Sequence, residues 1–427
     1  MRIRIHGGRV IDPGRGLDAA QDVYVADGRI AALGTPPGGF TAQREIDAGG
    51  CIVCPGLVDL CARLREPGEE HKATIASETR AAAAGGITTL CCPPDTDPVI
   101  DTPAVVELIH QRAEHAAYAR VLPLGALTHG LQGMQLSEMA ALKAAGCVAV
   151  SNALAPMTNT QVLRRAMEYA ATHGITVLLY SEDAYLSNGG CAHEGAVATR
   201  LGLPGIPAAA EIAAVARDLA LIEQTGVRAH FCHLTTTRAV HMVARAQHDG
   251  LPVSADVGAH YLHLTELDVL DFNSQCHVIP PLRTPRDRDG LRDGVSRGTV
   301  AAVCSDHQPH EPDAKYAPFP ATAPGISALE TLLPLALRLA DEGVMGLPEV
   351  LARLTVGPAR ILGIEAGILS VGARADVCIF DPQRRWRLEE RTLVSRGHNT
   401  PFLGQELKGR VRYTLLEGRV VYEKRPE

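Results

Sequence analysis

The sequence predicts an α/β fold, a (β/α)8 TIM barrel with a small composite β-sandwich domain. Eight apolar, strand-like runs recur along the middle of the chain, and each is followed by a loop and an amphipathic helical stretch. No G-x-G-x-x-G follows the first run, which disfavours an open doubly wound sheet. Both ends of the chain instead contain short strand-like segments broken by glycine turns.

The elements of the predicted barrel follow in regular order. Helices are expected at 69–86 and 207–226, among others, because both stretches are amphipathic and finish on glycine. Since β-like segments flank the barrel, we expect residues 1–56 and 364–427 to form one composite β domain around a barrel of residues 57–363. The expected strands span 57–60, 87–92, 120–126, 147–151, 175–180, 227–232, 252–257 and 299–304.

Composition excludes several classes of protein. The net charge of -7 and the lack of a basic run give no field for nucleic acid, and no apolar run is long enough to cross a membrane. The start of the chain has no signal core, so a cytoplasmic location is expected. The 11 cysteines lie mostly in apolar runs, which indicates buried thiols rather than disulfides, and the Cys51 and Cys54 pair is expected in the core.

The residues that follow the strands are the candidates for chemistry, because the carboxyl ends of barrel strands form the working face. Cys61 and Arg63 follow the first strand and point to the same side. The later strands lead, in turn, to Asp95, Asn152, Tyr180, His233, His260 and Asp306. Together these side chains are expected to form one ring.

Ten segments, in order over more than 350 residues, carry a resemblance to a known family. The chain resembles a dihydroorotase of the amidohydrolase superfamily. That resemblance implies a binuclear zinc centre, which ionises a water that attacks the ring amide of dihydroorotate. The segments are PGLVDL, LREPG, AAAAGGITT, DPVID, LGLPGIP, HFCHL, PPLR, SDHQPH, ALETLLPLAL and NTPFLGQELKG.

The chain departs from the family at the implied metal ligands. The family's His-x-His is Cys61-Ala62-Arg63 here, and a guanidinium offers no lone pair to zinc. The implied bridging ligand is Asn152 and the strand-five histidine is Tyr180. Only His233 and Asp306 of the implied ligand set remain, so the zinc site is predicted to be lost and no cofactor is expected.

The implied substrate contacts are also altered. Arg65 is kept, but Asp95 replaces an asparagine and would place an anion against the substrate carboxylate. Ile279 replaces a second asparagine, and His260 and His310 complete the vestigial pocket. No catalytic residue is assigned.

Other interpretations of the remaining ligands stay open. Taken alone, His233 could be a core histidine and Asp306 a structural carboxylate. Cys61, His233 and Asp306 could instead hold a single metal ion, although the Arg63 cation would repel it. A third hypothesis is that Arg63 occupies part of the metal's space and pairs with Asp306.

Two classes of function follow. We expect a pseudoenzyme, because the resemblance extends to inactive homologues that assemble with the catalytic chain of aspartate transcarbamoylase, as a homodimer or higher form within a hetero-oligomer. The alternative is a divergent cyclic-amide hydrolase with a mononuclear or metal-free site, in which His233, His260, Asp306, His307 or His310 supplies an acid or base. A sensor of orotate-like ligands is disfavoured by Asp95 and Ile279.

Overall fold

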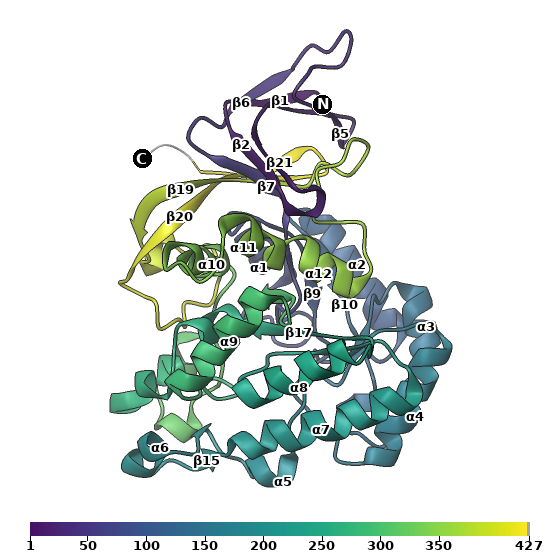
Figure 1. Ribbon diagram of the computed structural model, residues 1–427, viewed down its shortest axis with the longest axis vertical. Helices are drawn as coiled ribbons and strands as arrows, with labels where there is room; N and C mark the ends of the chain where they lie inside the picture. Colours follow the sequence, from purple (N-terminus) through teal and green to yellow (C-terminus); the bar gives the residue numbers. More distant parts are fainter. Residues whose placement is uncertain (425–427) are drawn as a thin grey trace.

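Parallel strands form the predicted barrel in the computed structural model, which describes residues 1–424 (Figure 1). Each of the eight predicted strand positions carries a strand, so the fold class is confirmed, and the third predicted strand is interrupted at Leu124. Neighbours pair in chain order through parallel ladders. The strands are β8 (Leu57–Asp59), β9 (Ile87–Cys92), β10 (Arg120–Pro123), β11 (Gly125–Ala126), β12 (Val150–Ser151), β13 (Val177–Leu179), β16 (Ala229–Phe231), β17 (Val253–Gly258) and β18 (Ala302–Cys304).

The seam between the last and first strands is closed by side-chain contacts as well as by the backbone. A parallel bridge joins Ala62 to His307 just beyond the strand ends. The buried carboxylate of Asp59, on β8, accepts the backbone N–H of Ser305 at 2.8 Å and also the hydroxyl of Ser305. These bonds bring the loop after β18 against the loop after β8, where the candidate site begins.

Helices follow the barrel strands, as the periodicity predicts. The first begins at Ile75 and not at residue 69, because the Thr74 side chain caps it by accepting the Ser77 backbone N–H at 3.1 Å. The longer helices are α1 (Ile75–Ala84), α2 (Pro103–Ala116), α4 (Thr160–Thr172), α7 (Ala208–Thr225), α8 (Thr237–His248), α9 (Pro285–Arg297) and α10 (Leu332–Asp341). The shorter helices are α3 (Met139–Ala145), α5 (Ala184–Ser187), α6 (Ala196–Leu201), α11 (Leu347–Leu354) and α12 (Val356–Leu362).

Strands from both ends of the chain share one sheet above the barrel (Figure 1). The order β21-β20-β19-β7-β2-β3 places β7 between C-terminal β19 and N-terminal β2. A second sheet, β5-β4-β1-β6, packs against it through a separate apolar core. The strands are β1 (Ile3–His6), β2 (Arg9–Asp12), β3 (Leu17–Ala20), β4 (Val23–Ala26), β5 (Arg29–Leu33), β6 (Arg44–Asp47), β7 (Ile52–Pro55), β19 (Val377–Arg387), β20 (Glu406–Leu416) and β21 (Arg419–Glu423).

Cysteine side chains are buried as small apolar groups. Cys51 immediately precedes β7 and Cys54 lies within it, and the two residues are 3% and 0% exposed, in agreement with a core role. All the cysteines are free thiols. Within residues 1–424, no helix combines the length and the apolar character that crossing a membrane requires.

Candidate functional site

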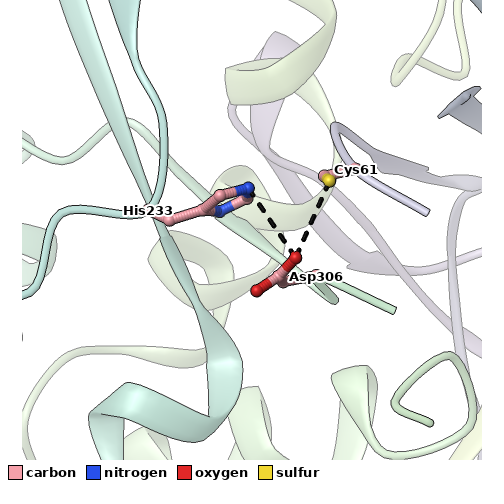
Figure 2. Close-up of side chains that lie close together, drawn as sticks. All are labelled: Cys61, His233 and Asp306. Atoms are coloured by element: carbon pink, nitrogen blue, oxygen red, sulfur yellow. Dashed lines mark hydrogen bonds and ion pairs between the residues drawn. The ribbon is translucent and has the colours of Figure 1, made fainter. Parts of the chain in front are cut away.

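Three of the predicted residues converge at the barrel mouth (Figure 2). Cys61 follows β8, His233 follows β16 and Asp306 follows β18. The Asp306 Oδ1 lies 3.8 Å from the Cys61 Sγ and 3.8 Å from the His233 Nε2. His233 and Asp306 have φ values of 53° and 46°, left-handed conformations that are unusual outside glycine and occur where a site fixes the backbone.

A guanidinium lies among these groups. The Arg63 Nη1 is 3.3 Å from the Asp306 Oδ1 and 3.8 Å from the Cys61 Sγ, and the Arg63 Nε donates to Asp95 at 2.7 Å. The Arg63 side chain is only 6% exposed. Burial alone would lower its pKa, but Asp95, Cys61 and Asp306 raise the pKa of Arg63 above its ordinary value, so the side chain stays charged. The hypothesised Arg63–Asp306 ion pair is therefore present.

The environment of Asp95 differs from the sequence-based expectation. Asp95 does not face the pocket as an uncompensated anion, because its Oδ2 accepts from the buried Arg63. Electrostatic repulsion of an anionic ligand by Asp95 is thus largely neutralised. Asp306 likewise accepts a second hydrogen bond, from the Gln308 Nε2 at 3.1 Å.

Two buried polar side chains, Asp256 and His230, form a hydrogen-bonded chain that ends on His233. Asp256 accepts the His233 backbone N–H at 2.7 Å and lies 3.3 Å from its Nδ1, while its other oxygen is 3.0 Å from the His230 Nε2. Burial opposes protonation of His233, but Asp306, Cys304 and Asp256 raise its pKa well above the ordinary value. The imidazole lies between two carboxylates, Asp306 and Asp256, which favour its protonated form.

Asn152 and Tyr180 are not brought into this cluster. The Asn152 amide is fully used: its oxygen accepts from the Thr128 hydroxyl at 2.7 Å, and its nitrogen donates to the carbonyls of Leu131 and Ala155, each at 3.1 Å. The Tyr180 hydroxyl donates to Glu182 at 2.8 Å. Asn152 therefore joins the loop after β12 to the loop after β11, and Tyr180 contacts the loop that follows its own strand.

The implied substrate residues are also held by internal contacts. The Arg65 guanidinium donates to the Pro309 carbonyl at 3.0 Å and to Glu69 at 2.9 Å, and it lies 3.1 Å from the His310 Nε2. Ile279 is half-buried beside the mouth loops. These contacts leave Arg65 few free donors for a carboxylate ligand.

His260 is the exception among the predicted residues. Both of its ring nitrogens are buried without a hydrogen-bond partner in the described part of the chain, and the residue is 1% exposed. Burial lowers the pKa of His260 to about 4, so the ring is neutral. The sequence analysis missed Asp256, His230 and Glu182, although an aspartate inside the apolar run PVSADV was a usable signal for the first.

The donor set does not fit the binuclear zinc centre that the fold family implies. Burial raises the pKa of the Cys61 thiol, despite the opposing effect of His233 and Arg63, so the sulfur is protonated. The ligand atoms within reach of Cys61 belong to His233 and Asp306, and the Arg63 guanidinium, which offers no lone pair, lies among them. Two divalent cations would meet that guanidinium, and the neighbouring carboxylates are already paired, Asp95 and Asp306 with Arg63 and Asp256 with His230 and His233.

A barrel with its polar residues gathered at the strand ends and a two-sheet β domain defines an amidohydrolase-type protein. The model of the Amidohydrolase family matches residues 322–422, and the model described as Dihydro-orotase-like matches residues 50–239. The solved L-hydantoinase (dihydropyrimidinase) from Arthrobacter aurescens has the same fold, with a TM-score of 0.89 at 23% identity over 99% of this chain and 96% of that one.

Full-length relatives place the chain within a narrower family. It is 55% identical to a dihydroorotase-like protein of Pseudomonas putida over 99% of both chains. It is 44% identical to a dihydroorotase of Geobacter sp. (strain M21) over 99% of this chain and 100% of that one. The chain belongs to the dihydroorotase-like family of the amidohydrolase superfamily.

Proposed function

We propose that this chain is a catalytically inactive dihydroorotase homologue that serves as a structural subunit for aspartate transcarbamoylase. The observation that carries the first half is the Arg63 guanidinium, which lies 3.3 Å from Asp306 where the family resemblance implies zinc. Removing two metal ions from such a mouth would leave a buried carboxylate without a counterion. Arg63 and the His233 cation supply that counter-charge.

Hydrolysis of a neutral ring amide needs a strong electrophile and an ionised water. In the family implied by the resemblance both come from zinc, and the side chains that replace the zinc ligands supply neither. A buried guanidinium already engaged by Asp95 and Asp306 has few donors left to polarise a carbonyl. The proposal therefore assigns no catalytic residue and no metal.

The second half of the proposal concerns the partner. The sequence aligns over 99% of both chains with the Pseudomonas putida relative, so the fold extends over the whole length, whereas the implied zinc ligands at the mouth are replaced. A chain that keeps the whole fold but does not hydrolyse dihydroorotate would be retained for its surface, which favours a role in assembly. The proposed partner is the catalytic chain of aspartate transcarbamoylase in the cytoplasm, with this chain as a homodimer or higher form within the hetero-oligomer.

Elemental analysis and an activity assay test the loss of catalysis. Protein purified without chelator should contain well under one zinc per chain and should turn over neither dihydroorotate nor carbamoyl aspartate. Stoichiometric zinc accompanied by turnover would overturn the proposal. An active dihydroorotase, purified and assayed in parallel, controls for zinc loss and for the assay.

Co-expression with the organism's own aspartate transcarbamoylase tests the assembly role. Size-exclusion chromatography should give one large co-eluting complex, whose mass by light scattering gives the stoichiometry. Separate elution of the two proteins at micromolar concentration would reject the assembly role even if catalysis is absent.

The alternative is a cyclic-amide hydrolase with one metal ion. Its support is that ligand atoms of Cys61, His233 and Asp306 all lie within 4.8 Å of one another. Metal binding would require loss of protons from Cys61 and His233 and displacement of Arg63. Zinc titration of the parent protein decides this case: a single saturable site that releases protons, together with amide hydrolysis, would favour the alternative.

A further inference from the structure

A groove of about 480 Å³ lies at the end of the barrel opposite the mouth. It runs along the amino-terminal ends of β16, β17 and β18, and helices α11 and α12 form its other wall. Figure 1 shows these two helices between the β sheets and the rest of the barrel. No group of the candidate site lines this groove, so its chemistry is separate.

Three arginines line the groove, and none of the aspartates and glutamates among residues 1–424 does. Arg228 and Arg360 are exposed, and neither side chain makes a hydrogen bond or ion pair within the described residues. Arg353 is half-buried and donates from Nε to the Val295 carbonyl at 3.0 Å, which leaves its two terminal nitrogens for other partners. In a chain with a net charge of -7, this is a local excess of positive charge.

The floor between the arginines is apolar. Leu251, Val253 and Ile361 contribute to it, and the last two are at most 9% exposed. The volume lies in the range of roughly 300–1000 Å³ that is typical of small-molecule sites. Guanidinium groups bind phosphate through paired N–H donors, and an apolar floor favours a ligand that also has a nonpolar part.

We propose that this groove binds an organic phosphate, with the phosphate on the guanidiniums and the nonpolar part over Leu251 and Ile361. The site goes beyond the proposed function and does not rest on it, because no residue of the mouth lines the groove. A concave groove of this size fits a small ligand better than an extended acidic segment of a protein, which is tested as the competing outcome.

Calorimetric titration of the full chain with phenyl phosphate tests the proposal. Phenyl phosphate should bind saturably and raise the melting temperature, phenol should not bind, and inorganic phosphate should bind more weakly than phenyl phosphate. Affinity should fall as salt is raised, because exposed charges are screened. Absence of phenyl phosphate binding, or tighter binding of a glutamate-rich peptide at the same arginines, would overturn the assignment.

Substitutions locate the site. Arg228→Ala and Arg360→Ala should each weaken phenyl phosphate binding about tenfold, the factor that corresponds to about 1.4 kcal/mol. The matched control is Arg286→Ala, which removes an exposed arginine of α9 outside the groove. Because all three side chains are exposed, the variants should fold, and unchanged binding in an Arg228→Ala, Arg360→Ala double variant would reject the groove as the site.

Discussion

Arg63 contacts two carboxylates and a thiol. Its replacement should therefore lower the stability of the protein, because a buried carboxylate would lose its cation. Arg63→Ala leaves Asp306, which is 1% exposed, without its closest cation. Breaking one partner of a buried pair costs about 3–5 kcal/mol. We expect a loss of this size in the free energy of unfolding measured in urea.

The second partner separates this effect from lost packing. An Arg63→Ala, Asp306→Ala double variant no longer contains the unpaired carboxylate. Its loss in the free energy of unfolding should therefore be smaller than the sum of the losses in the two single variants. Arg286→Ala, on the exposed face of α9, serves as the control and should change stability by less than about 0.5 kcal/mol. Equal stability of Arg63→Ala and the parent would contradict the ion-pair interpretation.

Restoring the family's first motif should restore metal binding. A Cys61→His, Arg63→His variant removes the guanidinium and adds two imidazoles beside His233 and Asp306. We expect zinc near one equivalent per chain, measured by elemental analysis after dialysis, against well under one in the parent. The single Cys61→His variant keeps Arg63 and should stay near the parent. Equal zinc in the double variant and the parent would show that the guanidinium is not what excludes the metal.

Strands and the residues after them could be predicted from the sequence, whereas the direction of each side chain could not. The barrel strands are short apolar runs, so their positions follow from composition and spacing alone. Asn152 and Tyr180 do follow strands, but their polar groups bond to Thr128 in the loop after β11 and to Glu182 in the loop after β13, and not to the cluster. Such partners become visible only when the loops are folded.

The pairing of Arg63 with Asp95 depends in the same way on packing between two elements. It joins the loop after β8 to the loop after β9, and 32 residues separate the two side chains in sequence. The sequence analysis treated Asp95 by the family role of its position. In the folded chain Asp95 pairs with Arg63 instead, because a buried cation is costly unless carboxylates neutralise it.

Glu330, just before α10, should give stability a measurable pH dependence. Its carboxylate accepts the backbone N–H groups of Val394 at 2.8 Å and Ser395 at 3.0 Å, which fastens the segment after β19 to the barrel. Burial raises the pKa of Glu330 from 4.5 to about 7, against the opposing effect of these two N–H groups. The folded state thus holds the proton more tightly than the unfolded state between these values, and the associated stability is lost as pH rises through about 7.

Glu330→Gln removes this titration. The stability of the variant relative to the parent should therefore increase from about pH 5 to about pH 8, as measured by urea unfolding at each pH. Glu406→Gln, which changes an exposed carboxylate paired with Arg385, is the control and should give no such trend. A flat difference for Glu330→Gln would mean that the folded and unfolded pKa values of Glu330 are the same.

The sheet that contains both ends of the chain joins the two cores of the molecule. Along β19, Val377 and Ile379 belong to the core between the two sheets, while Cys378 and Phe380 belong to the core of the barrel. Successive residues of a strand point to opposite faces, so this one sheet is covered on both sides. Unfolding either part would expose an apolar face of the other.

The whole molecule should consequently unfold as one cooperative unit. We expect a single calorimetric transition, and the variants Phe380→Ala and Ile379→Ala, one on each face of β19, should both lower that same transition. Each deletes a fully buried side chain and should cost about 2–5 kcal/mol. If the β domain and the barrel were independent, two transitions would appear and Ile379→Ala would shift only one of them. Independent unfolding of the β domain is unfavourable, because the sheet that contains β7 and β19 also covers the core of the barrel and its loss would expose that core to water.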